Sequence, residues 1–179
     1  MRIITGKYKG RHFEIPRSFK ARPTTDFAKE NIFNVLNGYI DFEESTALDL
    51  FSGTGSIALE LLSRGWSRVV SVEQDRDHHR FIQQCVEKIG GEALLTVQCI
   101  RGDAFRFIKS CRVQFDFIFA DPPYALKELP QIPDLVFEKS LLKPDGIFVF
   151  EHGKDQDFSQ HPHFVEHRNY GSVNFSLFR

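Results

Sequence analysis

The residues best suited to chemistry are Asp121-Pro122-Pro123-Tyr124, a run that directly follows the apolar segment 115–120. That segment predicts a buried strand because it is short, rich in aromatic residues and bounded by turn-forming residues. The run therefore falls at the carboxyl end of a strand, where open α/β sheets bind their ligands. Both prolines lack a backbone N–H and have a fixed φ, so their carbonyl groups form rigid acceptors.

This combination suits a planar base that carries an exocyclic amino group. The amine can donate hydrogen bonds to the Asp121 carboxylate and the Pro122 carbonyl, while Tyr124 stacks on the ring. The simpler alternative is a strand-ending turn, since Asp-Pro is common in turns. Glu151, which ends a later strand, could border the same pocket.

A second candidate site is the glycine turn around Gly53 and Gly55, where the backbone can approach a ligand closely. Asp49 lies just upstream and could meet a ligand's amino group. Glu73 ends the next strand, where an acid can accept hydrogen bonds from ribose hydroxyls. Asp103 follows the third strand and could accept a hydrogen bond from an adenine amino group.

The same turn also fits the dinucleotide fingerprint G-x-G-x-x-A from Gly53 to Ala58, which a dehydrogenase would use to hold a pyrophosphate. A negative charge at Asp49 suits a cation better than a phosphate. Together with Glu73 and Asp103 it favours a positively charged cofactor such as a sulfonium. No proton relay for a hydroxyl or carbonyl substrate stands out in the sequence.

These residues require a sheet that brings several strand ends to one edge. From residue 47 onward, hydrophobic patterning alternates between strand and helix, which predicts a mostly parallel sheet with helices on both faces. The last two strand-like runs, joined by Asn169-Tyr170-Gly171, predict a terminal antiparallel hairpin. The expected strands are 47–51, 68–73, 94–100, 115–120, 146–151, 163–168 and 172–178, and the expected helices are 56–64, 77–89, 104–110 and 133–140.

The first 40 residues differ in charge and pattern. Residues 2–5 and 11–15 predict a hairpin, and a helix capped by Thr24 or Thr25 follows. Residues 1–22 carry seven basic side chains and one acid, whereas the whole chain has a net charge of −1. Such a basic arm favours a polyanionic partner, although a solvated basic hairpin is the alternative. We expect residues 1–40 to form an extension and residues 41–179 the main domain.

The bulk composition sets further limits. With 179 residues and 41% hydrophobic content, we expect a globular protein. No apolar run is long enough to span a membrane, and the start lacks the apolar region of a signal peptide. The three cysteines are odd in number and have no metal spacing, so we expect reduced thiols, no metal and a cytoplasmic location.

On these motifs the chain resembles class I S-adenosylmethionine-dependent methyltransferases. More narrowly, it is similar to the bacterial small-subunit ribosomal RNA guanine-N2 methyltransferase family. The resemblance covers nearly the whole chain. It rests on the opening run 2–11, the block Arg22-Pro23-Thr24-Thr25-Asp26 with Glu30, the run 48–55, Val72-Glu73, Gly102-Asp103-Ala104, the run 121–124 and the tail 170–173.

The resemblance implies a Rossmann-like α/β fold and transfer of a methyl group from S-adenosylmethionine to guanine N2 in small-subunit ribosomal RNA, at position 966. It implies a monomer that acts on this RNA, within an assembling subunit or outside it, with no membrane partner. The departures at Thr5 and Phe27-Ala28-Lys29 bear on RNA contact. The implied catalytic residues are Asp121, Pro122, Pro123 and Tyr124; the implied cofactor residues are Arg22, Thr24, Thr25, Asp49, Phe51, Gly53, Gly55, Glu73, Asp103 and Ala104; the expected RNA-binding residues are Arg2, Lys7, Lys9, Arg11, Arg17 and Lys20.

Three other functions fit parts of the sequence. A DNA amino-methyltransferase would share the Asp-Pro-Pro-Tyr run, but such enzymes usually need an added target-recognition domain for which this chain has no room. An NAD-dependent oxidoreductase would use only the glycine turn. A non-catalytic RNA-binding module would use only the basic arm and would not need Glu73 or Asp121.

Overall fold

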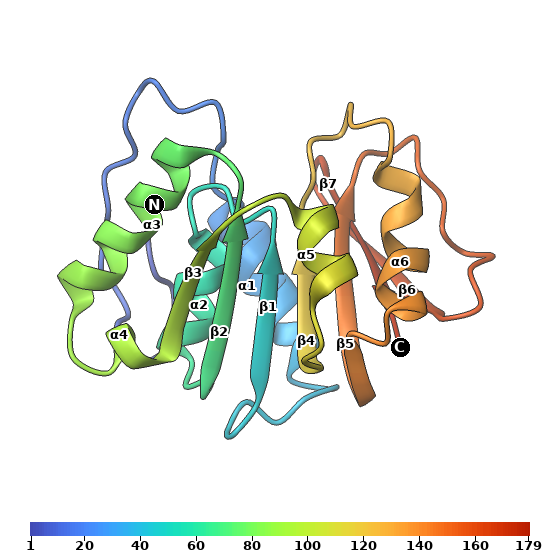
Figure 1. Cartoon of the computed structure of the whole chain (residues 1–179), viewed down its shortest axis with the longest axis horizontal. Coiled ribbons are helices and arrows are strands. Elements are labelled where there is room, and N and C mark those ends of the chain that lie inside the picture. Colours follow the sequence, from blue (N-terminus) through green and yellow to red (C-terminus); the bar gives the residue numbers. More distant parts are fainter.

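A computed structural model describes all residues, 1–179, and shows a single seven-stranded sheet covered by helices on both faces (Figure 1). The strand order is β3-β2-β1-β4-β5-β7-β6. The first five strands in this order run parallel, and β7 and β6 are antiparallel to their neighbours. The strands are β1 Thr46–Leu50, β2 Arg68–Glu73, β3 Val97–Arg101, β4 Phe115–Ala120, β5 Leu142–His152, β6 Phe164–Tyr170 and β7 Val173–Phe178.

The helices divide between the two faces. In Figure 1, α5 and α6 lie in front of the sheet, and α1 and α2 lie behind it. Alternate side chains of each strand pack into two separate hydrophobic clusters, as the two-residue period of a strand requires. The helices are α1 Asp26–Leu36, α2 Ser56–Ser63, α3 Arg76–Ile89, α4 Ala93–Thr96, α5 Ala104–Ser110 and α6 Ile132–Glu138, with a 3₁₀ turn η1 at Leu129–Gln131.

The predicted fold class is therefore confirmed, with two corrections to its elements. The strand expected over 94–100 begins only at Val97, because the short helix α4 occupies Ala93–Thr96. Ala, Leu and Leu are good helix formers, and Gly90-Gly91 lets the chain turn before them. The β5 strand starts at Leu142, four residues earlier than expected, and its pairing with β4 is interrupted by a register shift.

The N-terminal hairpin is also less regular than expected. Its two arms pair through the single bridge Arg2–His12 and form no regular strands. The reason is that several backbone donors of the first arm turn toward α2. The N–H groups of Ile4 and Thr5 each donate to the Glu60 carboxylate at 3.0 Å, and Lys7 N–H donates to the Ser63 carbonyl at 2.7 Å.

This hairpin packs into the main core. Ile3, Phe13 and Phe19 are buried in the same cluster as α1, α2 and one face of the sheet. Gly6 has a φ of +95°, and a Cβ there would lie 1.9 Å from the Ser63 carbonyl oxygen, so only glycine allows this contact. The division into an extension of residues 1–40 and a main domain of residues 41–179 stays a prediction. Deleting the hairpin would open the core.

A buried ion pair joins the hairpin to the helices behind the sheet. The side chains of Lys29 in α1 and Glu60 in α2 are at most 1% exposed, and Lys29 Nζ lies 3.4 Å from Glu60 Oε2. The Lys29 ammonium also donates to the Arg2 carbonyl at 2.7 Å and to Ser56 Oγ at 3.1 Å. Glu60 additionally pairs with Arg64 at 3.0 Å. This lysine therefore faces the protein interior, and its expected bearing on RNA contact is wrong.

Replacing Glu60 with Gln should strongly destabilise the fold, because the Lys29 charge would stay buried without its carboxylate. Breaking one partner of a buried pair costs about 3–5 kcal/mol, which lowers the melting temperature by roughly 6–20 °C in a chain of this size. The exposed pair Lys7–Glu92, at 2.9 Å, provides the matched control. Thermal unfolding of Glu92→Gln should stay within about 2 °C of the wild type, and equal losses in both variants would contradict the argument.

Candidate active site

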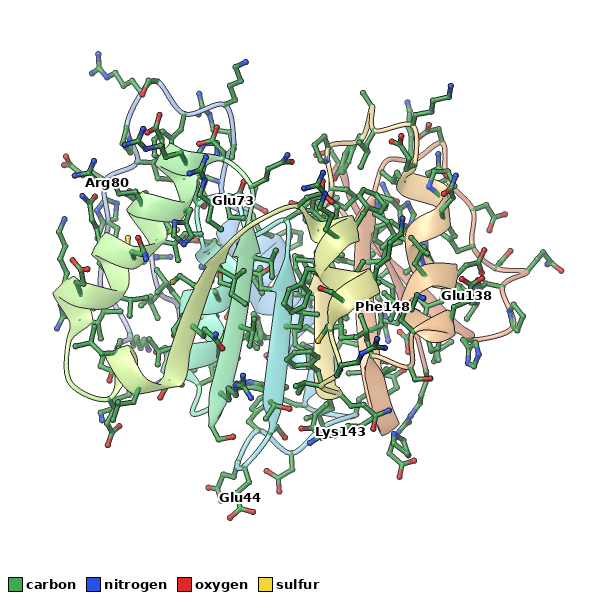
Figure 2. All side chains as sticks on the ribbon, viewed as in Figure 1. Glu44, Glu73, Arg80, Glu138, Lys143 and Phe148 are labelled. Carbon is green, nitrogen blue, oxygen red and sulfur yellow. The ribbon has the colours of Figure 1, made fainter.

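A pocket of about 800 Å³ opens at the carboxyl edge of the parallel strands, where the strand order reverses between β1 and β4. Figure 2 shows this edge at the top of the view, with Glu73 at the upper end of β2 and with Glu44 and Lys143 at the opposite edge. Ligands of open α/β sheets bind at this switch point. Of the residues expected to bind cofactor or base, the pocket is lined by Arg22, Thr24, Asp49, Phe51, Gly53, Glu73, Asp103, Ala104, Asp121, Pro122, Pro123 and Tyr124.

Four acids line up on one face of the sheet at this edge. In the strand register, Asp49 of β1 pairs with Ser71 of β2 on one side and with Phe119 of β4 on the other. Phe119 in turn pairs with Val149 of β5. Side chains two residues apart along a strand point to the same face. Glu73, Asp121 and Glu151 come two residues after Ser71, Phe119 and Val149, so they point to the same face as Asp49. All four line the pocket, so the sheet register converts scattered acids into one acidic row.

The glycine turn is held in place by Glu73. The N–H of Gly53 donates to Glu73 Oε2 at 2.7 Å, and the N–H of Asp75 donates to Oε1 at 3.0 Å. Each carboxylate oxygen keeps a second lone pair that a ribose hydroxyl could use. Gly55 does not line the pocket. It is the N-cap residue of α2 with a φ of +79°, and a Cβ there would lie 2.8 Å from Ile82. Its part is to shape the turn.

Asp49 is the deepest acid of the row. The side chain is 1% exposed, and its Oδ2 has no hydrogen-bond partner. Burial raises the pKa of Asp49 to about 8, and the nearby Glu73 charge adds to this rise. An unpartnered buried carboxyl oxygen facing a pocket is suited to a ligand ammonium group, which would supply both a donor and a compensating charge. This site therefore fits the amino-acid end of S-adenosylmethionine.

The adenine end of such a cofactor would meet aromatic surface. Phe51, which has a positive φ of 57°, and Phe105 lie edge to face with their ring centres 6.0 Å apart, and both line the pocket. Asp103 caps α5 by accepting from Arg106 N–H through Oδ1, which leaves Oδ2 for a ligand. Phe105 was missed by the sequence reasoning, although its position two residues after Asp103 was an available signal.

Residues 20–24 pass over the glycine turn as a strap that lines the pocket. A Cβ on Gly53 would lie 3.5 Å from the Ala21 Cβ. The Arg22 side chain donates to the carbonyl groups of Phe19 and Ala21, so it fixes the conformation of the strap locally. Thr25 does not line the pocket; its hydroxyl caps α1 by accepting from Ala28 N–H at 3.3 Å.

The run from Asp121 to Tyr124 leaves β4 at the other side of the pocket. The Tyr124 side chain is half-exposed, and its hydroxyl donates to Glu151 Oε1 at 2.9 Å. The pKa of Asp121 is raised well above its usual range by burial and by the neighbouring Glu151 carboxyl, and Asp49 adds a smaller effect. Burial also raises the pKa of Glu151. Both carboxyls therefore ionise less readily in the free protein than exposed carboxyls do.

The basic residues of the arm are placed differently from one another. Arg2 pairs with Asp26 at 2.7 Å, Lys7 pairs with Glu92, and Arg11 donates to the Lys88 carbonyl at 3.4 Å. Lys9 and Arg17 are exposed and make no side-chain hydrogen bond or ion pair, and Lys20 lies at the pocket rim. RNA binding by these six residues stays a prediction.

The histidines near the carboxyl end of the chain have partners within the protein. His161 contacts Asp134 at 2.9 Å and accepts from the His163 N–H at 3.1 Å, His163 stacks on Phe137, and His167 contacts Asn174. The cysteines at 85, 99 and 111 form no disulfide. None of the helices combines the length and apolar character needed to cross a membrane.

Comparison with known proteins agrees with this geometry. A family model described as Conserved hypothetical protein 95 matches residues 1–179. "Ribosomal RNA small subunit methyltransferase D" of Haemophilus influenzae is 30% identical over 185 residues, covering 100% of this chain and 93% of that protein. The protein of the same name from Escherichia coli strain K12 is 28% identical over 151 residues, covering 84% of this chain and 74% of that protein.

Solved structures share the fold. A hypothetical protein of Thermus thermophilus superimposes with a TM-score of 0.86 at 26% identity, covering 100% of this chain and 99% of that one. An RNA methyltransferase of Salinibacter ruber, solved with S-adenosyl-L-homocysteine, has a TM-score of 0.68 at 17% identity, covering 88% and 92% of the two chains, and supports the class I methyltransferase fold alone. The chain thus belongs to the Conserved hypothetical protein 95 family, which includes the proteins named ribosomal RNA small subunit methyltransferase D.

Proposed function

We propose that this protein transfers a methyl group from S-adenosylmethionine to the exocyclic N2 amine of a guanine in small-subunit ribosomal RNA, with guanine 966 as the expected target. The observation that carries the proposal is one pocket in which the unpartnered Asp49 and the Asp121–Tyr124 run lie next to each other. A cationic cofactor and a base with an amino group can therefore meet there. The whole pocket is built from one chain, so a monomer suffices.

The residues divide the work by position. Asp49 and the glycine turn would hold the amino-acid end of the cofactor, Glu73 its ribose, and Asp103 with Phe51 and Phe105 its adenine. When bound, S-adenosylmethionine supplies a methyl group made electrophilic by its sulfonium. Asp121 and the Pro122 carbonyl would accept hydrogen bonds from the amine, and Tyr124 would stack on the base once it is unstacked from the RNA.

Asp121 acts mainly by orientation and charge. The barrier lies in aligning the amine with the methyl group, to which positioning contributes several kcal/mol, on the order of 7–11 in the best cases. The ionised Asp121 carboxylate stabilises the positive charge that develops on the nitrogen. The amine proton can leave after transfer, so no strong base is needed. Because its pKa is raised in the free protein, methyl transfer should increase as the pH rises through the titration of the Asp121–Glu151 pair.

The alternative functions are less well supported by the site. A pyrophosphate placed at the glycine turn would face the acids Asp49 and Glu73, which disfavours an NAD-dependent oxidoreductase. A DNA amino-methyltransferase would use the same base pocket, but the relatives described above are named ribosomal RNA methyltransferases. A non-catalytic RNA-binding module would not require an unpartnered buried Asp49.

Purified protein should methylate small-subunit ribosomal RNA, or small subunits from cells that lack the enzyme, with mass spectrometry locating the product at guanine N2.

Asp121→Ala should nearly abolish transfer while the affinity for S-adenosylhomocysteine stays within a few-fold, because Asp121 faces the base. Glu73→Ala should weaken cofactor binding first, since a lost hydrogen bond to a charged group costs roughly 1.5–3 kcal/mol. Wild-type turnover by Asp121→Ala, or modification of DNA alone, would overturn the assignment.

The exposed basic side chains of the arm should bind phosphates of the RNA. Substituting Lys9 and Arg17 with Gln should lower the slope of log affinity against log salt by about 0.7–0.9 for each phosphate that these side chains neutralise. These two residues are exposed and unpaired, so the core should not change. The matched control is Lys109→Gln with Lys139→Gln, on α5 and just after α6, away from the arm. Equal slopes for the two double variants would favour a basic hairpin that only faces solvent.

A further inference from the structure

Glu151 is a buried acid in the part of the pocket that would hold the base. The proposed transfer reaction assigns it no contact with either ligand. Its side chain is 6% exposed and lines the pocket at the end of β5. Oε1 accepts the hydrogen bond from the Tyr124 hydroxyl, whereas Oε2 has no hydrogen-bond partner at all. A buried acceptor without a partner carries a cost of about 1–3 kcal/mol. An acceptor kept in this state next to a binding pocket is suited to a donor from the ligand.

The sheet register fixes where this acceptor lies. Phe119 of β4 pairs with Val149 of β5, so Asp121 and Glu151 follow at corresponding positions on the same face. The Tyr124 ring adjoins the backbone just after Glu151, since a Cβ on Gly153 would lie 3.5 Å from Tyr124 Cδ2. Asp121, Tyr124 and Glu151 therefore surround one space, from which a base held by Asp121 can reach Glu151.

Guanine presents two donor groups side by side on its Watson–Crick edge, the N2 amine and the N1–H. Adenine has an acceptor nitrogen at N1 instead, as does 2-aminopurine, which keeps the N2 amine. A flipped base is read by hydrogen bonds to this edge. Two neighbouring carboxylates match guanine, whereas an acceptor nitrogen at N1 would leave an ionised Glu151 without a donor and would face it with a second lone pair.

We propose that Glu151 is a specificity-determining residue that accepts a hydrogen bond from guanine N1–H while Asp121 holds the N2 amine. The inference rests on the proposed function, because it names the group that selects the base for that reaction. It assigns Tyr124 a second role, since its hydroxyl occupies Oε1 and thereby leaves Oε2 for the base. Burial raises the pKa of Glu151, and a donor from the base would offset part of that cost of ionisation.

The competing explanation is that Glu151 only supports Tyr124. Both explanations predict slower methylation after Glu151→Ala, so the rate on guanine cannot separate them. The ratio of rates on two bases can. RNA with 2-aminopurine at the mapped target position retains the amine that receives the methyl group but lacks the N1–H, so a supporting residue would affect both RNAs alike.

The experiment compares single-turnover methyl transfer to the guanine RNA and to the 2-aminopurine RNA. Wild-type protein should prefer guanine by at least about a hundred-fold, because a site built to hydrogen-bond a group rejects an analogue that lacks it. Glu151→Ala should reduce this preference to within a few-fold of one. Glu138→Gln, at an exposed position on α6, should keep the wild-type preference.

A hundred-fold preference that survives in Glu151→Ala would overturn the inference and leave a supporting role. A wild-type protein that methylates both RNAs equally well would also overturn it. Tyr124→Phe separates the two roles further, since the ring stays and only the donor to Oε1 is removed; it should narrow the preference less than Glu151→Ala does. If the wild-type protein methylates neither RNA at an exocyclic amine, the proposed function itself fails, which is a different result from either outcome above.

Discussion

The gathering of four carboxyl groups in one row, with Asp49 and Glu151 buried, is the constraint around which this molecule is organised. Glu73, Asp49, Asp121 and Glu151 come from four adjacent strands and share one face at the carboxyl edge of the sheet. Burial makes ionisation of the last three unfavourable and raises the pKa of each. Repulsion from neighbouring carboxylates adds to the rise at Asp49 and Asp121. A ligand that brings hydrogen-bond donors and positive charge relieves this cost. The pocket therefore binds such ligands in preference to neutral or negatively charged ones.

The rest of the fold holds this row in place and limits access to it. Residues 1–19 insert three apolar side chains into the core and present backbone donors to Glu60, so the strap that follows them is anchored at both ends. Lys29 links the same anchor to Ser56, which lines the pocket. The arm is thus both a part of the core and the support for one wall of the site, while its exposed basic side chains remain available to a polyanion.

Local features of the sequence predicted which acids lie together at one edge of the sheet. Strand ends, glycine turns and the Asp-Pro-Pro-Tyr run are local signals, and the predicted residues Asp49, Glu73, Asp103 and Asp121 all line one pocket. Contacts between distant segments could not be predicted in this way. Which helices and strands become neighbours decides that Lys29 pairs with Glu60 and that Glu151 lies near Asp121. Residues 2–5 form no strand because their backbone donors turn to Glu60 of α2.

The coupling of cofactor binding to ionisation of Asp49 tests this account most directly. With a pKa raised to about 8, Asp49 is mostly protonated at neutral pH and must release its proton to pair with the ligand's ammonium group. Calorimetric titration of S-adenosylhomocysteine at pH 7, in buffers with different ionisation enthalpies, counts the protons released. The account predicts release of close to one proton by the wild type and none by Asp49→Asn, which should also bind more weakly. Binding without proton release, or the same release by both proteins, would contradict it.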